Sequence, residues 1–221
     1  HPEFDSETMR TYAQQLQKSN EFCNPLDGYF PEIPVTEKAP PKGELYHTAE
    51  DCFVPAGTPV YAIGDGIIRY SGHARGYGGL IIIDHPTQNV YSLYGHLSRK
   101  QWRKKSGKVK KGEIIAYIGK AEDCYTRLAH IHFGLRMGQK GNYPIWGNNR
   151  WMAGYTNSSP RQLGWFEFSK IIGQTDSMRV WHNYIKKREN IDYTRKIKST
   201  DFRITLGSYY EKENLDQMIE K

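Results

Sequence analysis

The sequence lacks any uninterrupted apolar run approaching the roughly 20 residues that a membrane-spanning helix requires, so no such helix is expected. Cysteine is also scarce. The 221 residues contain three cysteines and no CxxC pair, which excludes a scaffold built on disulfides. The odd number leaves at least one thiol free or paired between chains. One disulfide among Cys23, Cys52 and Cys124 and three reduced thiols fit the sequence equally well.

The chain also lacks a methionine start and the basic-then-apolar pattern of a secretory signal. We expect its first residues to be a trimmed end, and export remains open. Acidic residues are in the minority, with 24 Asp and Glu against 31 Lys and Arg and a net charge of +7. This charge suits nucleic acid or an acidic polymer such as peptidoglycan, although a solubilising surface is a slightly better sole explanation.

The composition, 38% hydrophobic and 25% charged, is that of a globular protein with one catalytic domain and appendages. Residues 6–19 are predicted to form a short amphipathic helix with Ser6 as its N-cap. The prolines between residues 25 and 43 disfavour regular structure and predict an extended connector. We therefore expect an N-terminal extension, a helix and a Pro-rich connector, over residues 1–44.

Residues 45–137 alternate short β-rich runs with Gly, Pro and Asp, which predicts a compact domain of antiparallel β-sheet or sandwich. Three hairpins are expected in series, with turns at residues 64–66, 86–89 and 110–112. The expected fold class is therefore mainly β, with short helical extensions at both ends.

Beyond residue 137 the pattern weakens, and residues 138–221 are expected to form a C-terminal loop and α-helical extension. Residues 141–160 are rich in Gly, Asn and aromatics, which predicts an ordered loop that could wall a cleft. Helices are predicted at 177–188 and 209–221, on either side of a β-leaning stretch. Core packing is the favoured role for most aromatic residues here, with a sugar- or peptide-binding wall as the alternative. These residues are Trp146, Trp151, Tyr155 and Trp165.

Most of the eight histidines fall within residues 45–137, which favours a metal site. Catalytic zinc takes three protein ligands, commonly imidazole nitrogen or carboxylate oxygen, and keeps the fourth position for water. His47 and Asp51, spaced HxxxD, offer one nitrogen and one oxygen from a single segment. The pair His130 and His132 lies on one face of a predicted strand, so one imidazole can complete the set while the other faces substrate.

Either motif alone is more often surface polarity than a site, but their surroundings are specific. HTAEDCFVPAGTPVYAIGDGIIRYSG, GYGGLIIIDH, YSLYGHLS, GKVKKGEIIAYIG and AHIHFGL follow one another in this order. Over about residues 46–137 the succession closely resembles the lysostaphin-like zinc endopeptidases of cell-wall remodelling.

The resemblance implies one zinc ion per chain, held by His47, Asp51 and His132, with His96 and His130 beside the open site. Zinc would lower the pKa of its bound water, and the two other imidazoles would share the proton transfers and oxyanion stabilisation. Which of the two acts as base is left open. The resemblance further implies a narrow groove, peptidoglycan as partner, and a bacterial envelope location, periplasmic or secreted.

Two features depart from the family pattern. The segment GKAEDCYTRLAH before the HxH pair is longer and bulkier than the usual turn, and Cys52 stands where an apolar residue is typical. A disulfide between Cys52 and Cys124 is one hypothesis. His73 and His85 are expected to be solvated in turns, and His182 to be a packed or surface histidine.

Three other functions remain open. An inactive relative that binds peptidoglycan or activates an amidase would keep the fold, although none of the five site positions is lost here. A lipoyl- or biotinyl-type carrier would explain VKKGEIIAYIG but neither histidine motif. Nucleic-acid binding rests on charge alone, because no base-reading motif is present. The bond cleaved is not readable from the sequence, and a stem-peptide cross-link is the favoured substrate.

Overall fold

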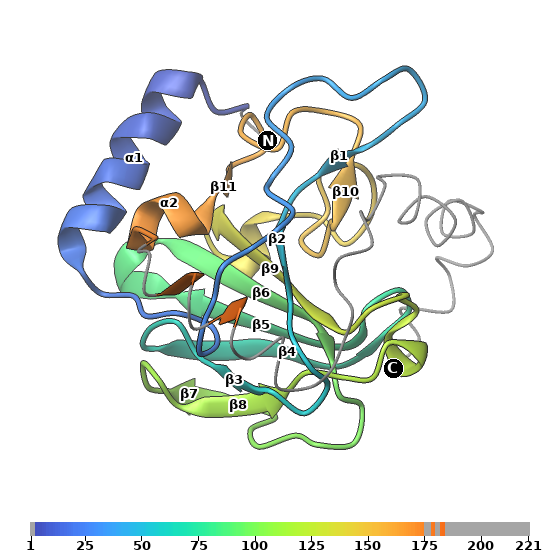
Figure 1. The fold of residues 1–221 in the computed structure, drawn as a ribbon. Helices are drawn as coiled ribbons and strands as arrows, with labels where there is room; N and C mark the ends of the chain where they lie inside the picture. The colour runs from blue at the N-terminus through green and yellow to red at the C-terminus, as the bar shows by residue number, and fades with distance from the viewer. Residues whose placement is uncertain (1–2, 175–177, 180–181, 184–221) are drawn as a thin grey trace.

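The computed structural model describes residues 3–174, 178–179 and 182–183. A seven-stranded antiparallel sheet forms its centre, which confirms the expected mainly β fold class (Figure 1). The strand order is β11-β9-β6-β5-β4-β7, and β2 also pairs with β9, beyond the residues that pair with β11. The strands of this sheet are β2 (Glu50–Phe53), β4 (Gly66–Ala74), β5 (Gly78–His85), β6 (Val90–Leu97), β7 (Gly107–Val109), β9 (His130–Met137) and β11 (Trp165–Phe166).

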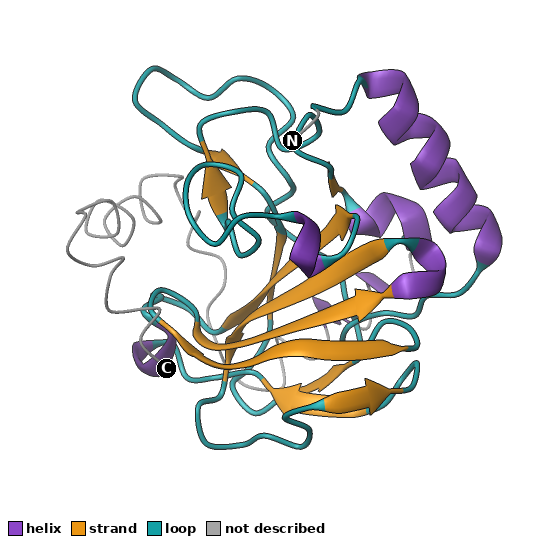
Figure 2. Cartoon of the chain, turned by 180° about the vertical axis from the view of Figure 1, so that it is seen from behind, coloured by secondary structure: helices purple, strands orange, loops and turns teal. Residues whose placement is uncertain are grey.

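Smaller elements surround this sheet. One two-stranded sheet joins β1 (Tyr46–His47) to β10 (Tyr155–Thr156), and another joins β3 (Pro59–Tyr61) to β8 (Ile114–Tyr117). The helices α1 (Ser6–Ser19) and α2 (Phe168–Ile172) lie against each other at one side of the molecule (Figure 2). Short 3-10 turns are η1 (Pro86–Gln88), η2 (Glu122–Cys124) and η3 (Lys140–Asn142).

The helix predicted at residues 6–19 is confirmed, but its predicted cap is wrong. Asp5 is the N-cap: its backbone is extended, and its carboxylate accepts a hydrogen bond from the Thr8 N–H at 2.7 Å. Ser6 is already the first helical residue. Met9 and Leu16 are buried and attach the helix to the core.

Of the three predicted hairpins, the middle one is confirmed, since β5 and β6 pair directly across residues 86–89. The outer two are wrong. β3 pairs with β8, and β4 pairs with β5 and β7, so residues 64–66 and 110–112 are corners between sheets. Val60 and Ile115 explain this arrangement, because β3 and β8 bury these side chains in the core instead of extending the main sheet.

The two faces of the main sheet have different covers. One face packs against α1, α2, β3 and β8 and forms the larger core. The other packs apolar side chains of β5 and β6 against residues 151–165. β9 serves both faces: Ile131 and Phe133 belong to the larger core, while His130 and His132 face the opposite side, as the predicted alternation requires.

The cysteines and His85 require two corrections. No disulfide joins any two of Cys23, Cys52 and Cys124, so the disulfide hypothesis is wrong. Cys52 lies in the larger core on β2, whereas the Cys124 thiol lies 3.5 Å from the Leu97 carbonyl oxygen. His85 is fully buried and not solvated, because it lies between the Asp65 carbonyl and the Ser92 hydroxyl.

Neither α1 nor α2 has the length and apolar character needed to cross a bilayer, and the same holds throughout the described part of the chain. The C-terminal elements predicted at 177–188, 191–206 and 209–221 lie outside the described residues, apart from positions 178, 179, 182 and 183.

Candidate active site

Three adjacent strands, β2, β9 and β6, position most of the candidate residues. Asp51 on β2 lies opposite His132 on β9, and Gly95 on β6 lies opposite the same histidine from the other side. His96 follows Gly95 with a φ of 59°, a left-handed conformation that is uncommon for a residue with a side chain. The Asp51 backbone also exchanges hydrogen bonds with Ile33 of the connector, which holds it from outside the sheet.

His47 reaches the site from a separate two-stranded sheet, in which it lies opposite Tyr155. The connector fixes its orientation from the other side. The His47 N–H donates to the Thr36 hydroxyl at 2.9 Å, and its ring Nδ1 lies 3.2 Å from the Pro34 carbonyl oxygen. Because a carbonyl can only accept, Nδ1 carries the proton and Nε2 is left to bind a metal.

Three potential ligand atoms converge: His47 Nε2, Asp51 Oδ1 and His132 Nδ1. The two nitrogens are 3.1 Å apart, and Oδ1 lies 3.4 Å from His47 Nε2 and 3.0 Å from His132 Nδ1. Tetrahedral zinc with ordinary bond lengths holds such ligands about 3.4 Å from one another. All three residues are at most 5% exposed. The donor set therefore fits a tetrahedral metal ion with little rearrangement.

Burial and neighbouring charges shift the pKa values of these residues in opposite directions. Burial would raise the pKa of Asp51 and lower that of His47, but their mutual attraction dominates. The Asp51 carboxyl consequently has a pKa well below its usual value, and the His47 pKa is raised. For His132, burial prevails over the neighbouring carboxylate and lowers the pKa to about 4. A neutral imidazole, the form that binds metal, is thus favoured at His132.

His96 and His130 lie beside the three potential ligands, with their ring centroids 4.4 Å apart. His130 Nδ1 lies 2.8 Å from the Leu128 carbonyl oxygen, and its Nε2 lies 3.8 Å from Asp51 Oδ2. His96 Nδ1 is buried without a hydrogen-bond partner in the described part of the chain. Burial, followed by the charges of His130 and His132, holds the pKa of His96 well below its usual value. His96 is therefore neutral near pH 7.

The segment 150–156 covers this site, and it lies within the loop of residues 141–160 that was predicted as a possible cleft wall. Three of its backbone carbonyls accept side-chain hydrogen bonds. The Ala153 carbonyl accepts from the Thr48 hydroxyl at 2.6 Å. The Met152 carbonyl accepts from the Tyr77 hydroxyl at 2.9 Å, and the Trp151 carbonyl from the Tyr91 hydroxyl at 2.6 Å. These bonds bring the next residues of the segment against His47 and His132.

Tyr155, which the sequence indicated only as one of four aromatics in a possible binding wall, lies directly at the site. Its ring centroid lies 5.0 Å from that of His47 and 6.2 Å from that of His132. Burial, reinforced by the charge of Asp51, raises its pKa well above the usual value, so the phenol stays protonated. No local motif marks it, since its position depends on pairing with a strand more than 100 residues earlier.

Two of the other three aromatic residues of the predicted cleft wall take the packing role that we favoured. Trp151 and Trp165 are buried in the smaller core, whereas Trp146 is 42% exposed. Of the other histidines, His73 is exposed as expected and His182 is packed, at 2% exposure. The structure thus brings together all five predicted site residues, which are His47, Asp51, His96, His130 and His132.

Comparison with known proteins identifies relatives of this central region. The model of peptidase family M23 matches residues 45–144. The DD-carboxypeptidase/endopeptidase Mpg of Neisseria meningitidis is 34% identical over 99 residues, which cover 45% of this chain and 22% of that protein. Lipoprotein NlpD of Yersinia enterocolitica is 36% identical over 90 residues, or 40% of this chain and 88% of the relative.

Among solved structures, the antimicrobial peptidase lysostaphin from Staphylococcus simulans is similar, with a TM-score of 0.50 and 25% sequence identity. The similarity covers 72% of this chain and 57% of lysostaphin. The family model matches the central region alone, and the match with Mpg covers 22% of that relative.

Proposed function

The chain belongs to peptidase family M23, the lysostaphin-like family. On this basis we propose that it is a zinc-dependent endopeptidase that hydrolyses peptide bonds of bacterial peptidoglycan. One observation carries the proposal: two imidazole nitrogens and one carboxylate oxygen lie 3.0 to 3.4 Å from one another in a buried site. Three ligands of this kind leave a tetrahedral ion one position for water, which is the arrangement of catalytic zinc.

The five residues divide into two groups. His47, Asp51 and His132 would hold the ion through Nε2, Oδ1 and Nδ1. Zinc held there would supply Lewis-acid polarisation of the scissile carbonyl and of the attacking water. Pro34 and Thr36 keep His47 in the required orientation, and the pairing of β2 with β9 does the same for the other two ligands.

His96 and His130 would hold and move protons. The Leu128 carbonyl retains the proton on His130 Nδ1, so proton exchange takes place at Nε2, on the side of Asp51. His96 is neutral, and its Nδ1 is available to accept a proton or, once protonated, to donate to the oxyanion. The two rings are close enough to act jointly on one substrate carbonyl and its leaving amine.

The proposed substrate is a stem-peptide cross-link, because the relative Mpg is named as a DD-carboxypeptidase and endopeptidase. Peptidoglycan is a bacterial envelope polymer, which places the activity in the periplasm or outside the cell. The positive net charge suits the acidic wall.

The test is digestion of purified sacculi by the full chain, followed by mapping of the released muropeptides and measurement of bound zinc. We expect loss of cross-linked muropeptides, abolished by chelation and restored by zinc. His132→Ala should lower the rate at least roughly a thousandfold, because the ion loses one of three ligands. The matched control is His73→Ala, which removes an exposed imidazole and should leave the rate unchanged.

Equal rates for the wild type and His132→Ala would contradict the proposal. Wall binding by zinc-free protein without any hydrolysis would point instead to an inactive relative that binds peptidoglycan.

A further inference from the structure

A second group of metal-binding side chains lies behind the proposed catalytic site. Cys52 follows Asp51 on β2, and neighbouring residues of a strand face opposite sides. Asp51 therefore faces His132 while Cys52 faces the larger core. Around the Cys52 thiol, Glu32 arrives from the connector and His182 from the C-terminal part of the chain. These three residues come from distant segments and carry three different ligand types.

We propose that Glu32, Cys52 and His182 form a second metal site, which takes a thiolate-binding divalent cation of the zinc class and has a structural role. The site goes beyond the proposed hydrolysis, since none of its residues faces the catalytic histidines. Thiolate and imidazole together favour zinc over magnesium or calcium, which prefer oxygen ligands.

The Cys52 thiol and the His182 imidazole are already close to the arrangement of a bound state. Cys52 Sγ lies 3.8 Å from His182 Nδ1, compared with about 3.6 Å for sulfur and nitrogen on one tetrahedral zinc ion. One ligand atom from each of the three residues lies within 4.8 Å of the other two. Glu32 Oε1 contacts the other imidazole nitrogen, Nε2, at 2.8 Å. Binding at Nδ1 therefore requires the carboxylate to swing around the ring edge while the thiol and imidazole stay in place.

Backbone donors already support two of the ligands. The Phe30 N–H donates to Cys52 Sγ at 3.4 Å, and the Phe53 N–H donates to Glu32 Oε2 at 3.0 Å. Such hydrogen bonds to ligand atoms are usual around protein metal sites, where they orient the ligands. The second bond leaves Glu32 Oε1 directed at His182.

Burial and access are consistent with a metal site. Cys52 is fully buried and His182 is 2% exposed, so a thiolate here needs a cation beside it. The Glu32 side chain keeps 28% of its surface exposed, which gives an ion a path from solvent. A bound ion would join the connector, β2 and the C-terminal segment at the back of the strand that carries Asp51.

Cobalt(II) substitution of the full chain separates the two sites. Thiolate ligands give cobalt an intense near-ultraviolet charge-transfer absorption, and the catalytic set of two histidines and one aspartate contains no thiolate. We expect two cobalt ions per chain and one thiolate band. In His132→Ala we expect one ion with the band retained, and in Cys52→Ser one ion with the band lost.

Further variants show whether a lost band reflects misfolding and whether another thiol produces the band. His182→Gln removes a ligand from a different segment and should also abolish the band, whereas Cys124→Ser and Cys23→Ser should retain it. A single ion per chain without the band overturns the proposal, and so does a band that survives both Cys52→Ser and His182→Gln. Neither result bears on sacculus digestion, so this site and the proposed enzyme can fail independently.

Discussion

The two ring nitrogens of His132 have very different surroundings. Nδ1 lies 3.0 Å from Asp51 Oδ1 and 3.1 Å from His47 Nε2. Nε2 is buried and has no hydrogen-bond partner in the part of the chain that the structure describes. A ligating imidazole usually donates its second N–H, as His47 does to Pro34. Packing must therefore hold the His132 ring in place, and the backbone of Gly154 lies directly against it.

Replacing Gly154 by Ala adds a single methyl group beside the site and should disturb it. A Cβ at this position would lie 2.6 Å from the Tyr77 hydroxyl and 3.2 Å from His132 Nε2. The segment must shift or the imidazole must turn, and we expect the rate of sacculus digestion to fall on the order of tenfold or more. Digestion kinetics and zinc affinity of the purified variant measure this.

Gly141→Ala is the matched control, because a Cβ there has no neighbour within 4 Å. It should digest sacculi at the wild-type rate. If Gly154→Ala also kept both rate and zinc affinity, the covering segment would not be part of the site.

At the scale of elements, β9 holds the covering segment through one buried arginine. Arg136 is fully buried, and its guanidinium donates to the Leu163 carbonyl at 2.8 Å and to the Arg150 carbonyl at 3.1 Å. The Tyr143 ring stacks on it at 3.6 Å. In the described part of the chain no carboxylate pairs with Arg136, so carbonyl and aromatic groups stabilise its charge.

Arg136→Met should therefore lower the free energy of unfolding by more than about 2 kcal/mol, because it leaves buried carbonyls without donors. Sacculus digestion should fall as well, since the segment that carries Tyr155 loses one of its attachments. Urea titration measures the first effect. Arg161→Met, which removes an exposed guanidinium 3.5 Å from Glu37, should change stability by less than roughly 0.5 kcal/mol. Equal losses in the two variants would contradict this role.

His85 at the end of β5 should make the fold sensitive to acid. Burial lowers its pKa from about 6.5 to about 4. Between these values the unfolded chain binds more protons than the folded one, so stability falls as pH decreases from 6.5 towards 4. The full loss from this group is about 3 kcal/mol. His85→Gln should remove this contribution, seen as a smaller drop in unfolding free energy between pH 7 and pH 4.5.

The drop in unfolding free energy of each variant must be compared with that of the wild type, because other buried histidines also titrate. His73→Gln alters an exposed histidine whose pKa burial lowers less than that of His85, so it should keep most of the wild-type drop. If His85→Gln matched the wild type over this range, the buried imidazole would not be the group that senses acid.

The success of sequence reasoning depended on how local each signal was. The HxxxD and HxH spacings, together with strand alternation, pointed to His47, Asp51, His130 and His132 and to the strand of residues 130–137, whereas His96 followed from the resemblance to the lysostaphin-like family. The partners of β3 and β8 could not be read, because a turn rich in Gly and Asp can close a hairpin or pass between sheets. The place of Tyr155 beside His47 could not be predicted for the same reason, since its register with His47 is set by tertiary packing.

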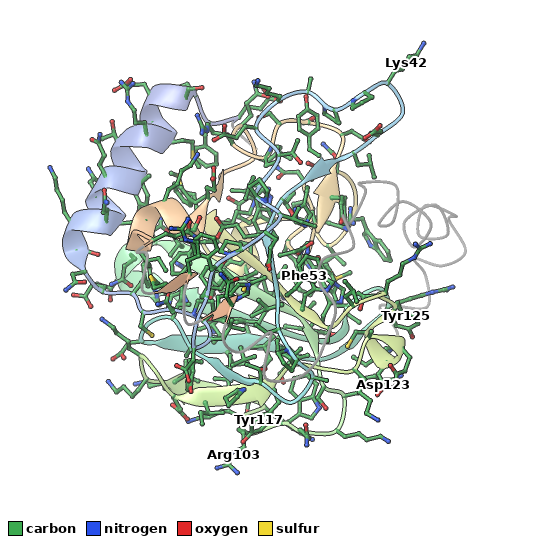
Figure 3. All side chains as sticks on the ribbon, in the orientation of Figure 1. Lys42, Phe53, Arg103, Tyr117, Asp123 and Tyr125 are labelled. Carbon is green, nitrogen blue, oxygen red and sulfur yellow. The ribbon has the colours of Figure 1, made fainter. Side chains whose placement is uncertain are left out.

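At the scale of the whole molecule, one described segment is especially rich in positive charge. Residues 99–111 contain no Asp or Glu, and Figure 3 shows Arg103 at the lower edge, far from Lys42 at the opposite end. Within the described residues, Lys104 and Lys110 have acidic partners, which are Glu113 and Asp65. The cationic residues of this stretch are Arg99, Lys100, Arg103, Lys104, Lys105, Lys108, Lys110 and Lys111.

This concentration predicts salt-sensitive binding to the acidic wall. Arg99, Lys100 and Arg103 are exposed, and no described carboxylate pairs with them. Replacing all three by Gln should weaken sacculus binding roughly tenfold at low ionic strength, with the difference shrinking as salt screens the remaining charge. Lys18, Lys38 and Lys42 are also exposed, and replacing them by Gln removes the same net charge elsewhere. Cosedimentation across a salt series measures both variants. Equal weakening would show that wall binding depends on total charge alone, whereas a larger loss in the first variant assigns it to residues 99–111.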